Sequence, residues 1–550
     1  MNVAQTAAEI FRREGVEFLF AYPVNALTES CAEIGIRPII VRHERVAGNM
    51  ADALSRLSSG ERVGVLATQH GPGIENAFAA VAQAWSEGVP MVVVPAGYPR
   101  VQSWVGPHFN AALNFQHITK TCEQITTPAA IVPALRRAFS VARNGRPGPT
   151  LVVPYDTWSE TVPDTGDYVP VSKVLTAPPL TDIKAAADIL LRAKRPVIYA
   201  GQGVHYAKGW NALRRVAELL EVPVTTSLEG KSAFTEAHPL SLGSGGVAMP
   251  HAVCQHIPDA DVIFGVGVSF AATSFGIRFP TAHKTFIHNT IEFSNLNRNI
   301  AVSCSLLGDS RLTLEMLYDE VSDRLGGAPR GQGAEVSARI RAQNDPWMAK
   351  WKHLLESDSQ PLSPYRVIRD LLQTVEVGKT IISHDAGSPR DELSPFWQTN
   401  SPLSYIGWGK STQLGYSLGL AMGAKLTHPE KLCINVWGDA AIGMTGMDFE
   451  TAVRLPIPIL SILFNNFSMA MEHGQMSVSR NKFKTTDISG HYADWAAALG
   501  GHSERVTDPS RIVPAIRAAI AATEAGRPAL LEFITTQEKV FSTWADRYAR

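Results

Sequence analysis

Short apolar runs alternate with amphipathic segments along the whole chain. In the first third, the apolar runs have strand length, and the segments between them carry apolar residues at helical spacing. The predicted strands are 17–23, 37–43, 63–68, 91–97 and 145–156, and the predicted helices are 4–14, 26–34, 74–88 and 129–143, with another starting at Glu44. This alternation predicts a parallel sheet with helices on both faces.

The same alternation recurs twice further along the chain. The second stretch has predicted strands at 195–204 (ending in a glycine turn), 222–227, 261–267 and 284–289, and helices at 207–220 and 310–325. The third has strands at 431–437, 459–464 and 529–535, and helices at 446–455 and 510–525. A proline-rich stretch (157–182) and a glycine-rich polar stretch (326–345) are expected linkers. The sequence therefore predicts an α/β protein of three domains, at residues 1–165, 183–327 and 358–550.

Composition narrows the functional class. The 550 residues include 50 basic and 51 acidic side chains, so no basic surface for nucleic acid or an anionic membrane is expected. No apolar run reaches the roughly 18 residues of a membrane span, and the N-terminal segment lacks the apolar core of a secretory signal. The five cysteines are scattered without metal-ligand spacing, which favours reduced thiols in a cytoplasm.

Polar residues follow two of the predicted strands in the third stretch. Asp439 comes directly after the strand 431–437, and Asn466 comes shortly after the strand 459–464. Because parallel neighbours end at the same sheet edge, we expect these two side chains to lie together, where Mg²⁺ could bind with a substrate diphosphate. The plain alternative is a helix-capping Asp and a turn Asn. The expected buried stripe of the connecting helix is Met447, Ala452, Val453 and Leu455.

The Gly-Asp and Asn-Asn pairs at this spacing resemble the diphosphate-binding motif of thiamine diphosphate (ThDP) enzymes. The whole chain is similar to the acetolactate synthase–pyruvate decarboxylase–benzoylformate decarboxylase superfamily, with pyrimidine, central and diphosphate domains in that order. The acetolactate synthase branch matches best. The segments that carry this resemblance are 145–156, 195–204, 223–243 and 414–426.

The resemblance implies roles for individual residues. Glu44, in the segment VRHERVAGNMADALSR, matches the glutamate that contacts the cofactor's pyrimidine ring and promotes proton removal at the thiazolium carbon. Leu414 matches the bulky residue beneath the cofactor, although Thr412 and Gln413 replace the usual small residues before it. The implied metal ligands are Asp439, Asn466 and the carbonyl of Ser468. The implied cofactor contacts around them are Gly438, Met469 and Ala440, which replaces the usual second glycine.

Polar residues at three further places match substrate-facing positions of relatives. These are Asn25, the pair Gln69-His70, and Glu472, six residues after Asn466. Each could move a proton or orient a carboxylate. A turn Asn, a His bonded to backbone and a solvated Glu remain open alternatives. Met469 and Met471 suggest an apolar wall beside Glu472.

The central stretch departs from the flavin-binding members of the superfamily. Where those carry Arg-Phe-Asp-Asp-Arg, this chain reads SFAAT (269–273), and their His-Ile-Asp-Ile-Asp run reads HNTIE (288–292). Thr290 cannot accept a hydrogen bond from a ribose as an aspartate does, and the glycine turn at 201–203 is a weak nucleotide signal alone. The sequence favours absence of FAD over its presence. An ADP-like nucleotide or an empty domain fits equally well.

These observations predict a ThDP- and Mg²⁺-dependent lyase or carboligase that acts on a small 2-oxo acid or related carbonyl compound. The resemblance implies a homodimer or homotetramer with sites between subunits. Three alternatives stay open: a 2-oxo acid decarboxylase, a 2-hydroxyacyl-CoA lyase, and a non-catalytic paralogue. A CoA lyase would need a nucleotide site and a C-terminal lid, for which the polar, aromatic tail 536–550 is a candidate.

Overall fold

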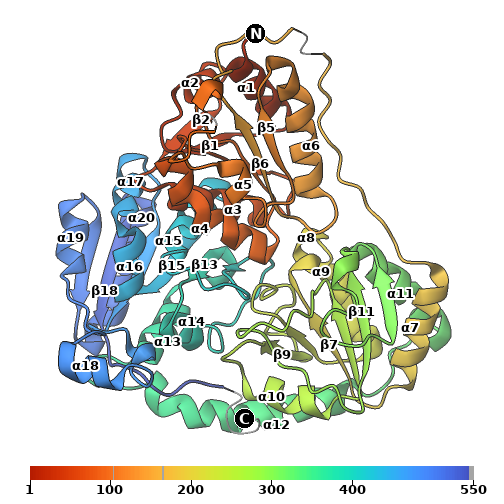
Figure 1. The fold of residues 1–550 in the computed structure, drawn as a ribbon. Helices are drawn as coiled ribbons and strands as arrows, with labels where there is room; N and C mark the ends of the chain where they lie inside the picture. The colour runs from red at the N-terminus through yellow and green to blue at the C-terminus, as the bar shows by residue number, and fades with distance from the viewer. Residues whose placement is uncertain (103, 164–165, 544–550) are drawn as a thin grey trace.

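The computed structural model describes residues 1–102, 104–163 and 166–543 as three α/β domains (Figure 1). Each domain is built on a six-stranded sheet in which all paired strands run parallel. In Figure 1 the first domain lies at the top, the second at the right and the third at the left. The predicted α/β architecture with three parallel sheets is confirmed.

The first sheet has the strand order β2-β1-β3-β4-β6-β5. Its strands are β1 (Phe18–Ala21), β2 (Arg37–Ile40), β3 (Gly64–Ala67), β4 (Met91–Val93), β5 (Cys122–Ile125) and β6 (Pro149–Pro154). Its helices are α1 (Val3–Arg13), α2 (Asn25–Glu33), α3 (Glu44–Leu57), α4 (Pro72–Glu87), α5 (Ala111–Asn114) and α6 (Ile131–Arg143). One apolar core lies on each face of this sheet, as expected for a parallel sheet covered on both sides.

The second sheet has the order β12-β11-β10-β7-β8-β9. Its strands are β7 (Pro196–Ala200), β8 (Val224–Thr226), β9 (Ser241–Ser244), β10 (Val262–Val266), β11 (Thr285–Thr290) and β12 (Cys304–Leu307). Its helices are α7 (Leu180–Arg192), α8 (Gln202–Tyr206), α9 (Trp210–Leu220), α10 (His251–Asp259) and α11 (Ser310–Leu325). The chain adds β8 and β9 on one side of β7 and then returns to place β10 on the other side. The connections that follow β7 and β10 therefore leave in opposite directions, and open α/β sheets bind ligands at such a point.

The third sheet has the order β14-β13-β15-β16-β18-β17. Its strands are β13 (Thr380–His384), β14 (Tyr405–Ile406), β15 (Leu432–Gly438), β16 (Leu460–Asn465), β17 (His502–Val506) and β18 (Ala529–Ile534). Its helices are α13 (Pro364–Thr374), α14 (Ser388–Leu393), α15 (Ser417–Thr427), α16 (Asp439–Thr445), α17 (Phe449–Arg454), α18 (Ser477–Phe483), α19 (Tyr492–Ala498) and α20 (Ile512–Glu524). The directly paired strands β13, β15 and β16 end at one edge, and this edge positions the candidate site.

Two expectations about this region were wrong. The glycine-rich stretch 326–345 is not wholly a linker, because α12 (Gly333–Leu355) begins inside it and runs along the bottom of Figure 1. This helix is stabilised by packing: Ile340 is buried in a core of the second domain, and Trp351 in a core of the third. Met447 is 52% exposed, because a 3-10 turn (Gly446–Asp448) separates α16 from α17 and breaks the expected helical phase.

Helices α3 and α15 join the first and third domains in one shared core. Two glycines permit their close approach. A Cβ on Gly419 would lie 2.6 Å from Asn49 Cβ, and one on Gly423 would lie 2.5 Å from the Met50 carbonyl oxygen. Helix α3 begins at Glu44 and α15 follows Leu414 almost directly, so this contact fixes two predicted site residues relative to each other.

The described part of the C-terminal tail, residues 536–543, forms hydrogen bonds with the third domain and with the second domain. Gln537 Nε2 donates to the carbonyl of Asn466 at 3.1 Å, and Tyr365 Oη donates to the carbonyl of Val540 at 2.5 Å. Ser542 Oγ donates to the carbonyl of Met249 at 2.6 Å. The rest of the tail, 544–550, lies outside the described residues. Within those described, no helix combines the length and apolarity needed to cross a bilayer.

Candidate functional site

The carboxyl ends of β15 and β16 bring the predicted metal ligands together. Gly438 pairs in register with Phe464, so Asp439 and Asn466 leave neighbouring strands within one residue of the same level. The backbone N–H of Ser468 donates to Asp439 Oδ2 at 3.1 Å and to Asn466 Oδ1 at 3.0 Å. A carboxylate oxygen and an amide oxygen thus converge on one point beside the third predicted ligand.

Burial changes the acidity of the Asp439 carboxyl group. The residue is 4% exposed, and burial raises the pKa of its carboxyl to about 6. Backbone N–H groups, including those of Ser468 and Ala440, oppose that rise. A divalent cation would stabilise the charged carboxylate here, and oxygen donors of this kind suit Mg²⁺. The donor set therefore fits a metal–diphosphate group.

Asp385 is a site residue that the sequence reasoning missed. It follows β13, the strand next to β15, and is fully buried. Its carboxylate accepts from the backbone N–H of Gly415 at 2.8 Å and from the N–H and hydroxyl of Ser417 at 3.0 and 2.8 Å. Burial raises the pKa of Asp385, while these donors lower it. Asp385 therefore anchors the chain directly after Leu414.

The predicted residues of the first domain also gather at one sheet edge. Asn25, Glu44 and Gln69 follow β1, β2 and β3, which are direct neighbours. Glu44 is 4% exposed, and its Oε2 accepts from Asn76 Nδ2 at 3.1 Å. A Cβ on Gly73 would lie 3.0 Å from Gln69 Cβ and 3.5 Å from Glu44 Oε1. The glycine thus brings Gln69 and Glu44 close together.

Asn25, Gln69 and His70 are exposed in this chain. His70 forms an edge contact with Tyr98, with ring centroids 4.6 Å apart, and Tyr98 stacks on His108 at 3.9 Å. This row of three rings lines a small cavity at the carboxyl edge of the first sheet. Tyr98 and His108 were not predicted, because ring stacking between distant loops leaves no pattern in the sequence.

Leu414 is half-buried against the shared core of α3 and α15. The Arg45 guanidinium, next to Glu44, donates to the Leu414 carbonyl oxygen. The amide of Gln413, directly before Leu414, is buried, and neither of its polar atoms has a hydrogen-bond partner among the described residues. A buried amide without partners fits a position beside a polar ligand.

Glu472 and Met471 are exposed, so the expected apolar wall does not form within this chain. The cause is local: both residues lie in a 3-10 turn (Ala470–Glu472) that stands out from the sheet edge. The neighbouring His473, which the sequence reasoning passed over, bonds through Nε2 to Ser468 Oγ at 2.7 Å. His473, directly after this turn, is thus in contact with the side chain of one residue that is predicted to bind the metal through its carbonyl.

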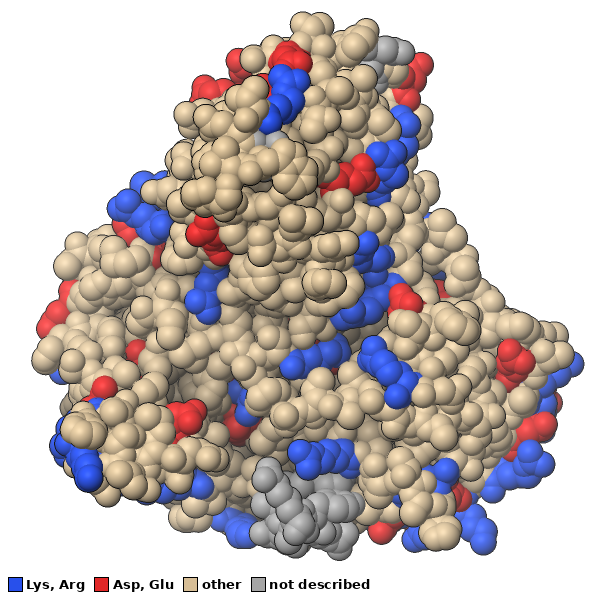
Figure 2. Space-filling model, viewed as in Figure 1, with Lys and Arg blue, Asp and Glu red and all other residues tan. Residues whose placement is uncertain are grey.

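A cavity of about 440 Å³ opens between the first and second domains. Three segments singled out in the sequence line it together: the glycine turn at 201–203, the segment 269–273, and Thr290 to Glu292. Thr290 Oγ1 accepts from Asn295 Nδ2 at 3.2 Å, while the carboxylate of Glu292 stands in the wall. Figure 2 shows several Lys and Arg side chains along the seam between these domains.

Comparison with known protein families matches each of the three domains. Residues 1–119 match the thiamine pyrophosphate enzyme N-terminal TPP binding domain, and residues 183–317 match the central domain of the same enzymes. Residues 385–533 match their C-terminal TPP binding domain.

Curated relatives match over most of the chain. A probable acetolactate synthase large subunit of Methanocaldococcus jannaschii is 27% identical over 97% of this chain and 92% of its own length. The acetolactate synthase isozyme 3 large subunit of Escherichia coli is 28% identical over 83% of this chain and 81% of its own. The mitochondrial acetolactate synthase catalytic subunit of Saccharomyces cerevisiae is 27% identical over 84% of this chain and 70% of its own.

Proposed function

Because the chain belongs to the acetolactate synthase-like branch of the ThDP-dependent enzymes, we propose that it is a Mg²⁺-dependent C–C bond lyase or carboligase. Its substrate is a 2-oxo acid or a related carbonyl compound. The observation that carries the proposal is the buried Asp439 carboxylate, which converges with Asn466 on Ser468 at the ends of two paired strands. An Asp that only caps a helix has no reason to be buried next to a second oxygen that could bind a metal, here Asn466 Oδ1.

The residues present fit the cofactor. Asp439, Asn466 and the Ser468 carbonyl would hold Mg²⁺, and Gly438, Ala440 and Met469 would border the diphosphate. When bound, ThDP supplies a nucleophilic carbon and a sink for the electrons of the broken C–C bond. The buried Gln413 amide and Leu414 would border its rings. The chain itself contributes cation binding, ring orientation and exclusion of water.

Glu44 is the proposed proton-handling residue on the cofactor side. Asn76 engages its Oε2, which leaves Oε1 as the oxygen available to hold a proton against a ring nitrogen. Its burial keeps water from competing for that proton. Asn25, Gln69, His70 and Glu472 are proposed to orient the substrate or to move a proton on it. Their exposure in the single chain fits sites that a second subunit completes.

We propose that these sites form between two subunits, in a dimer or tetramer. Large apolar side chains are exposed on both cofactor-binding domains. They are Val101, Trp104 and Leu113 in the first domain, and Phe467, Val478 and Phe483 in the third. Covering both sets with a second copy would bury them and close the exposed substrate-side residues. Mixing Glu44→Gln with Asp439→Ala subunits tests this.

Each variant alone should be inactive, and the mixture should regain about a quarter of wild-type activity, since half the dimers are mixed and each has one intact site. A mixture that stays inactive while a tag on one variant co-purifies the other variant, as it does in mixed dimers, would place both halves of a site in one chain.

The reaction type is tested with ThDP-loaded protein and a panel of 2-oxo acids, acyloins and 2-hydroxyacyl-CoAs. Released CO₂ and aldehyde are measured together. A carboligase gives an acyloin or acetohydroxy acid product, whereas a simple decarboxylase gives aldehyde in equal amount to CO₂. Cleavage of a 2-hydroxyacyl-CoA would select the CoA lyase, and no turnover with any compound would favour the non-catalytic paralogue.

FAD is not part of the proposal, since the segment 269–273 lacks the charged run of flavin-binding members. The cavity of the second domain leaves an ADP-like nucleotide or an empty site as equal alternatives. Mass spectrometry of the small molecules released on denaturation decides between them. A cytoplasmic location is proposed from the five cysteines, which are scattered along the sequence without metal-ligand spacing.

A further inference from the structure

The connection between β14 and α15 carries Leu414, and charged side chains of the first domain hold its backbone. Arg56 Nη1 donates to the Gly407 carbonyl oxygen at 2.8 Å. Arg56 is itself buried in an ion pair with Asp52, with Nε and Oδ1 2.6 Å apart. Near the other end of the connection, Arg45 donates to the carbonyl of Leu414. Backbone carbonyl groups near both ends of the connection are therefore held by side chains of the first domain.

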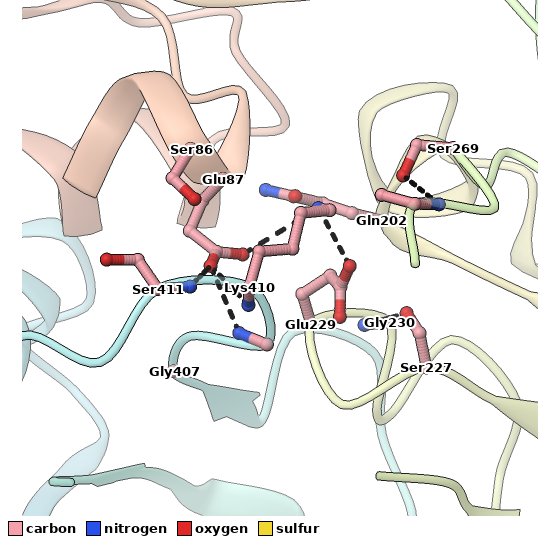
Figure 3. A network of polar contacts seen from close by, with 12 residues as sticks. Ser86, Glu87, Gln202, Ser227, Glu229, Gly230, Ser269, Gly407, Lys410 and Ser411 are labelled. Carbon is pink, nitrogen blue, oxygen red and sulfur yellow. Dashed lines mark hydrogen bonds and ion pairs between the residues drawn. The ribbon is translucent and has the colours of Figure 1, made fainter. Parts of the chain in front are cut away.

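Glu87 holds the middle of the same connection. It is the last residue of α4, and its side chain is completely buried. Its Oε1 accepts from three consecutive backbone N–H groups: Gly409 at 3.1 Å, Lys410 at 2.8 Å and Ser411 at 3.2 Å. Figure 3 shows the side chain reaching from the helix of the first domain to this loop. Three donors on one carboxylate oxygen define the loop's conformation.

The second domain closes the cluster from the opposite side. Lys410 Nζ lies 2.8 Å from Glu229 Oε1 and 3.8 Å from Glu87 Oε2. A Cβ on Gly409 would lie 2.1 Å from Glu229 Oε2, so the loop packs directly against that carboxylate. Figure 3 shows Lys410 between the two glutamates. All three domains therefore meet at this loop, beside the cavity of the second domain.

We propose that Glu87 is a positioning residue for the cofactor: its carboxylate fixes the peptides at 409–411 and thereby sets the position of Leu414, three residues further on. The inference rests on the proposed role of Leu414 beneath the cofactor. Glu87 does not touch the reacting atoms, and it acts only through the loop.

The contacts favour positioning over general stabilisation. A carboxylate that accepts from several backbone N–H groups makes directional, charge-assisted hydrogen bonds. Such bonds fix the conformation of a loop, whereas apolar burial stabilises it without fixing the direction of its peptides. Without the acceptor, one buried and two partly buried N–H groups lose their partner. A loop without regular structure can then restore their hydrogen bonds only by moving. Leu414 and Gln413 lie within that movable stretch, while Asp385 continues to hold Gly415.

The first test needs no cofactor. Hydrogen–deuterium exchange of the apo protein should be slow at 409–411 and become at least about tenfold faster in Glu87→Leu, which keeps the volume but removes the acceptor. The N–H of Gly415, held by Asp385, should stay protected. Glu87→Gln keeps one acceptor oxygen and should restore most of the protection at 409–411. Unchanged exchange at 409–411 in Glu87→Leu overturns the proposal.

The second test links the loop to the cofactor. In Glu87→Leu the Kd for ThDP, measured by titration calorimetry with Mg²⁺, should rise about tenfold, and kcat should fall about 10²-fold with little change in KM. Glu87→Gln should recover most of both.

Glu14 supplies the control, since it is an equally buried glutamate of the first domain, bonded to Arg143 at 2.6 Å and away from the loop. Glu14→Leu should lower thermal stability without changing ThDP affinity. Equal losses of ThDP affinity in Glu87→Leu and Glu14→Leu would make Glu87 merely structural and overturn the proposal. A wild type that does not bind ThDP would instead refute the proposed function, while the exchange data would still report the Glu87 contact.

Discussion

Adding one methyl group between α3 and α15 should disturb both stability and catalysis. A Cβ on Gly423 would lie 2.5 Å from the Met50 carbonyl oxygen, 2.9 Å from Met50 Cα and 2.8 Å from Ala53 Cβ. Ordinary contact would require the two helices to separate by about 1 Å. Two of the three obstacles are backbone atoms, so side-chain rotation cannot relieve the clash. Overpacking of this kind costs about 1–3 kcal/mol.

The separation should reach the proposed sites, because it displaces Glu44 at the start of α3 and Leu414 just before α15, whichever subunit's site each residue serves. A misplacement of about 1 Å in a catalytic arrangement can cost about 10²-fold in rate. We therefore expect Gly423→Ala to lower the thermal midpoint by about 1–2 °C per kcal/mol lost, since two domains share this core, and to lower kcat as well. Differential scanning calorimetry of the apo protein and steady-state kinetics of the loaded protein measure the two effects.

Two further variants sharpen the experiment. Gly443→Ala adds a methyl group to a helical glycine with nothing within 4 Å of the new atom, so its midpoint should stay at or slightly above that of the wild type. Ala53→Gly should not rescue Gly423→Ala, because the clash with Met50 backbone remains. A Gly423→Ala protein with the wild-type midpoint would refute the close packing of these helices.

Three other perturbations have defined outcomes. Glu44→Gln should still bind ThDP with near wild-type Kd but lose about 10²–10⁴-fold in kcat, and calorimetric loss of binding would contradict its role in proton handling. Burial lowers the pKa of His384 to about 3, so the unfolded chain takes up a proton below pH 6.5 that the folded state does not. Stability is therefore lost as the pH falls from 6.5 towards 3, by up to about 1.4 kcal/mol per pH unit. In His384→Gln the free energies of unfolding measured with urea at pH 7 and pH 5 should differ less than in the wild type. Burial raises the pKa of Asp448 to about 6, so between pH 4 and 6 the folded state retains a proton that the unfolded chain has lost. Stability therefore falls as the pH rises through that window. Asp448→Asn should abolish this dependence, and an unchanged profile of the free energy of unfolding against pH would show that Asp448 does not titrate there.

The meeting of Asp439 and Asn466 could be predicted from the sequence for a geometric reason. Two short apolar runs joined by a helix-length segment form parallel neighbours, and parallel neighbours end at the same edge. The same reasoning relates Asn25, Glu44 and Gln69 across the first sheet. For Asp439 and Asn466 the prediction needed only local periodicity and the rule of parallel connection, whereas Asn25, Glu44 and Gln69 were singled out by the family resemblance.

Sheet edges and packed connectors were harder to predict. The strands β5, β9 and β12 lie at sheet edges and have four residues each. They read CEQI, SLGS and CSLL, so they lack the continuous apolar run of a central strand. Helix α12 starts with glycine and contains Pro346, yet it forms because Ile340 and Trp351 are buried against two different domains. Tertiary packing outweighed local propensity there.

The missed carboxylates share one property. Asp385 and Glu87 bind backbone N–H groups of a loop that lies 30 to 324 positions further along the chain. Backbone partners have no residue type, so nothing at 409–411 or at Gly415 marks them in the sequence. Such anchors become visible only when the fold is known.

Asp448 offers a matched control for the proposed role of Asp439 in holding the metal and diphosphate of ThDP. Both carboxyls are buried in the connection between β15 and β16, and burial raises the pKa of each to about 6. Only Asp439 lies at the sheet edge beside Asn466 and Ser468. Titration calorimetry of ThDP into apo protein with Mg²⁺ should show Kd raised at least about tenfold in Asp439→Asn and unchanged in Asp448→Asn. Equal affinity of Asp439→Asn and wild type, or no binding of ThDP by the wild type, would contradict the account.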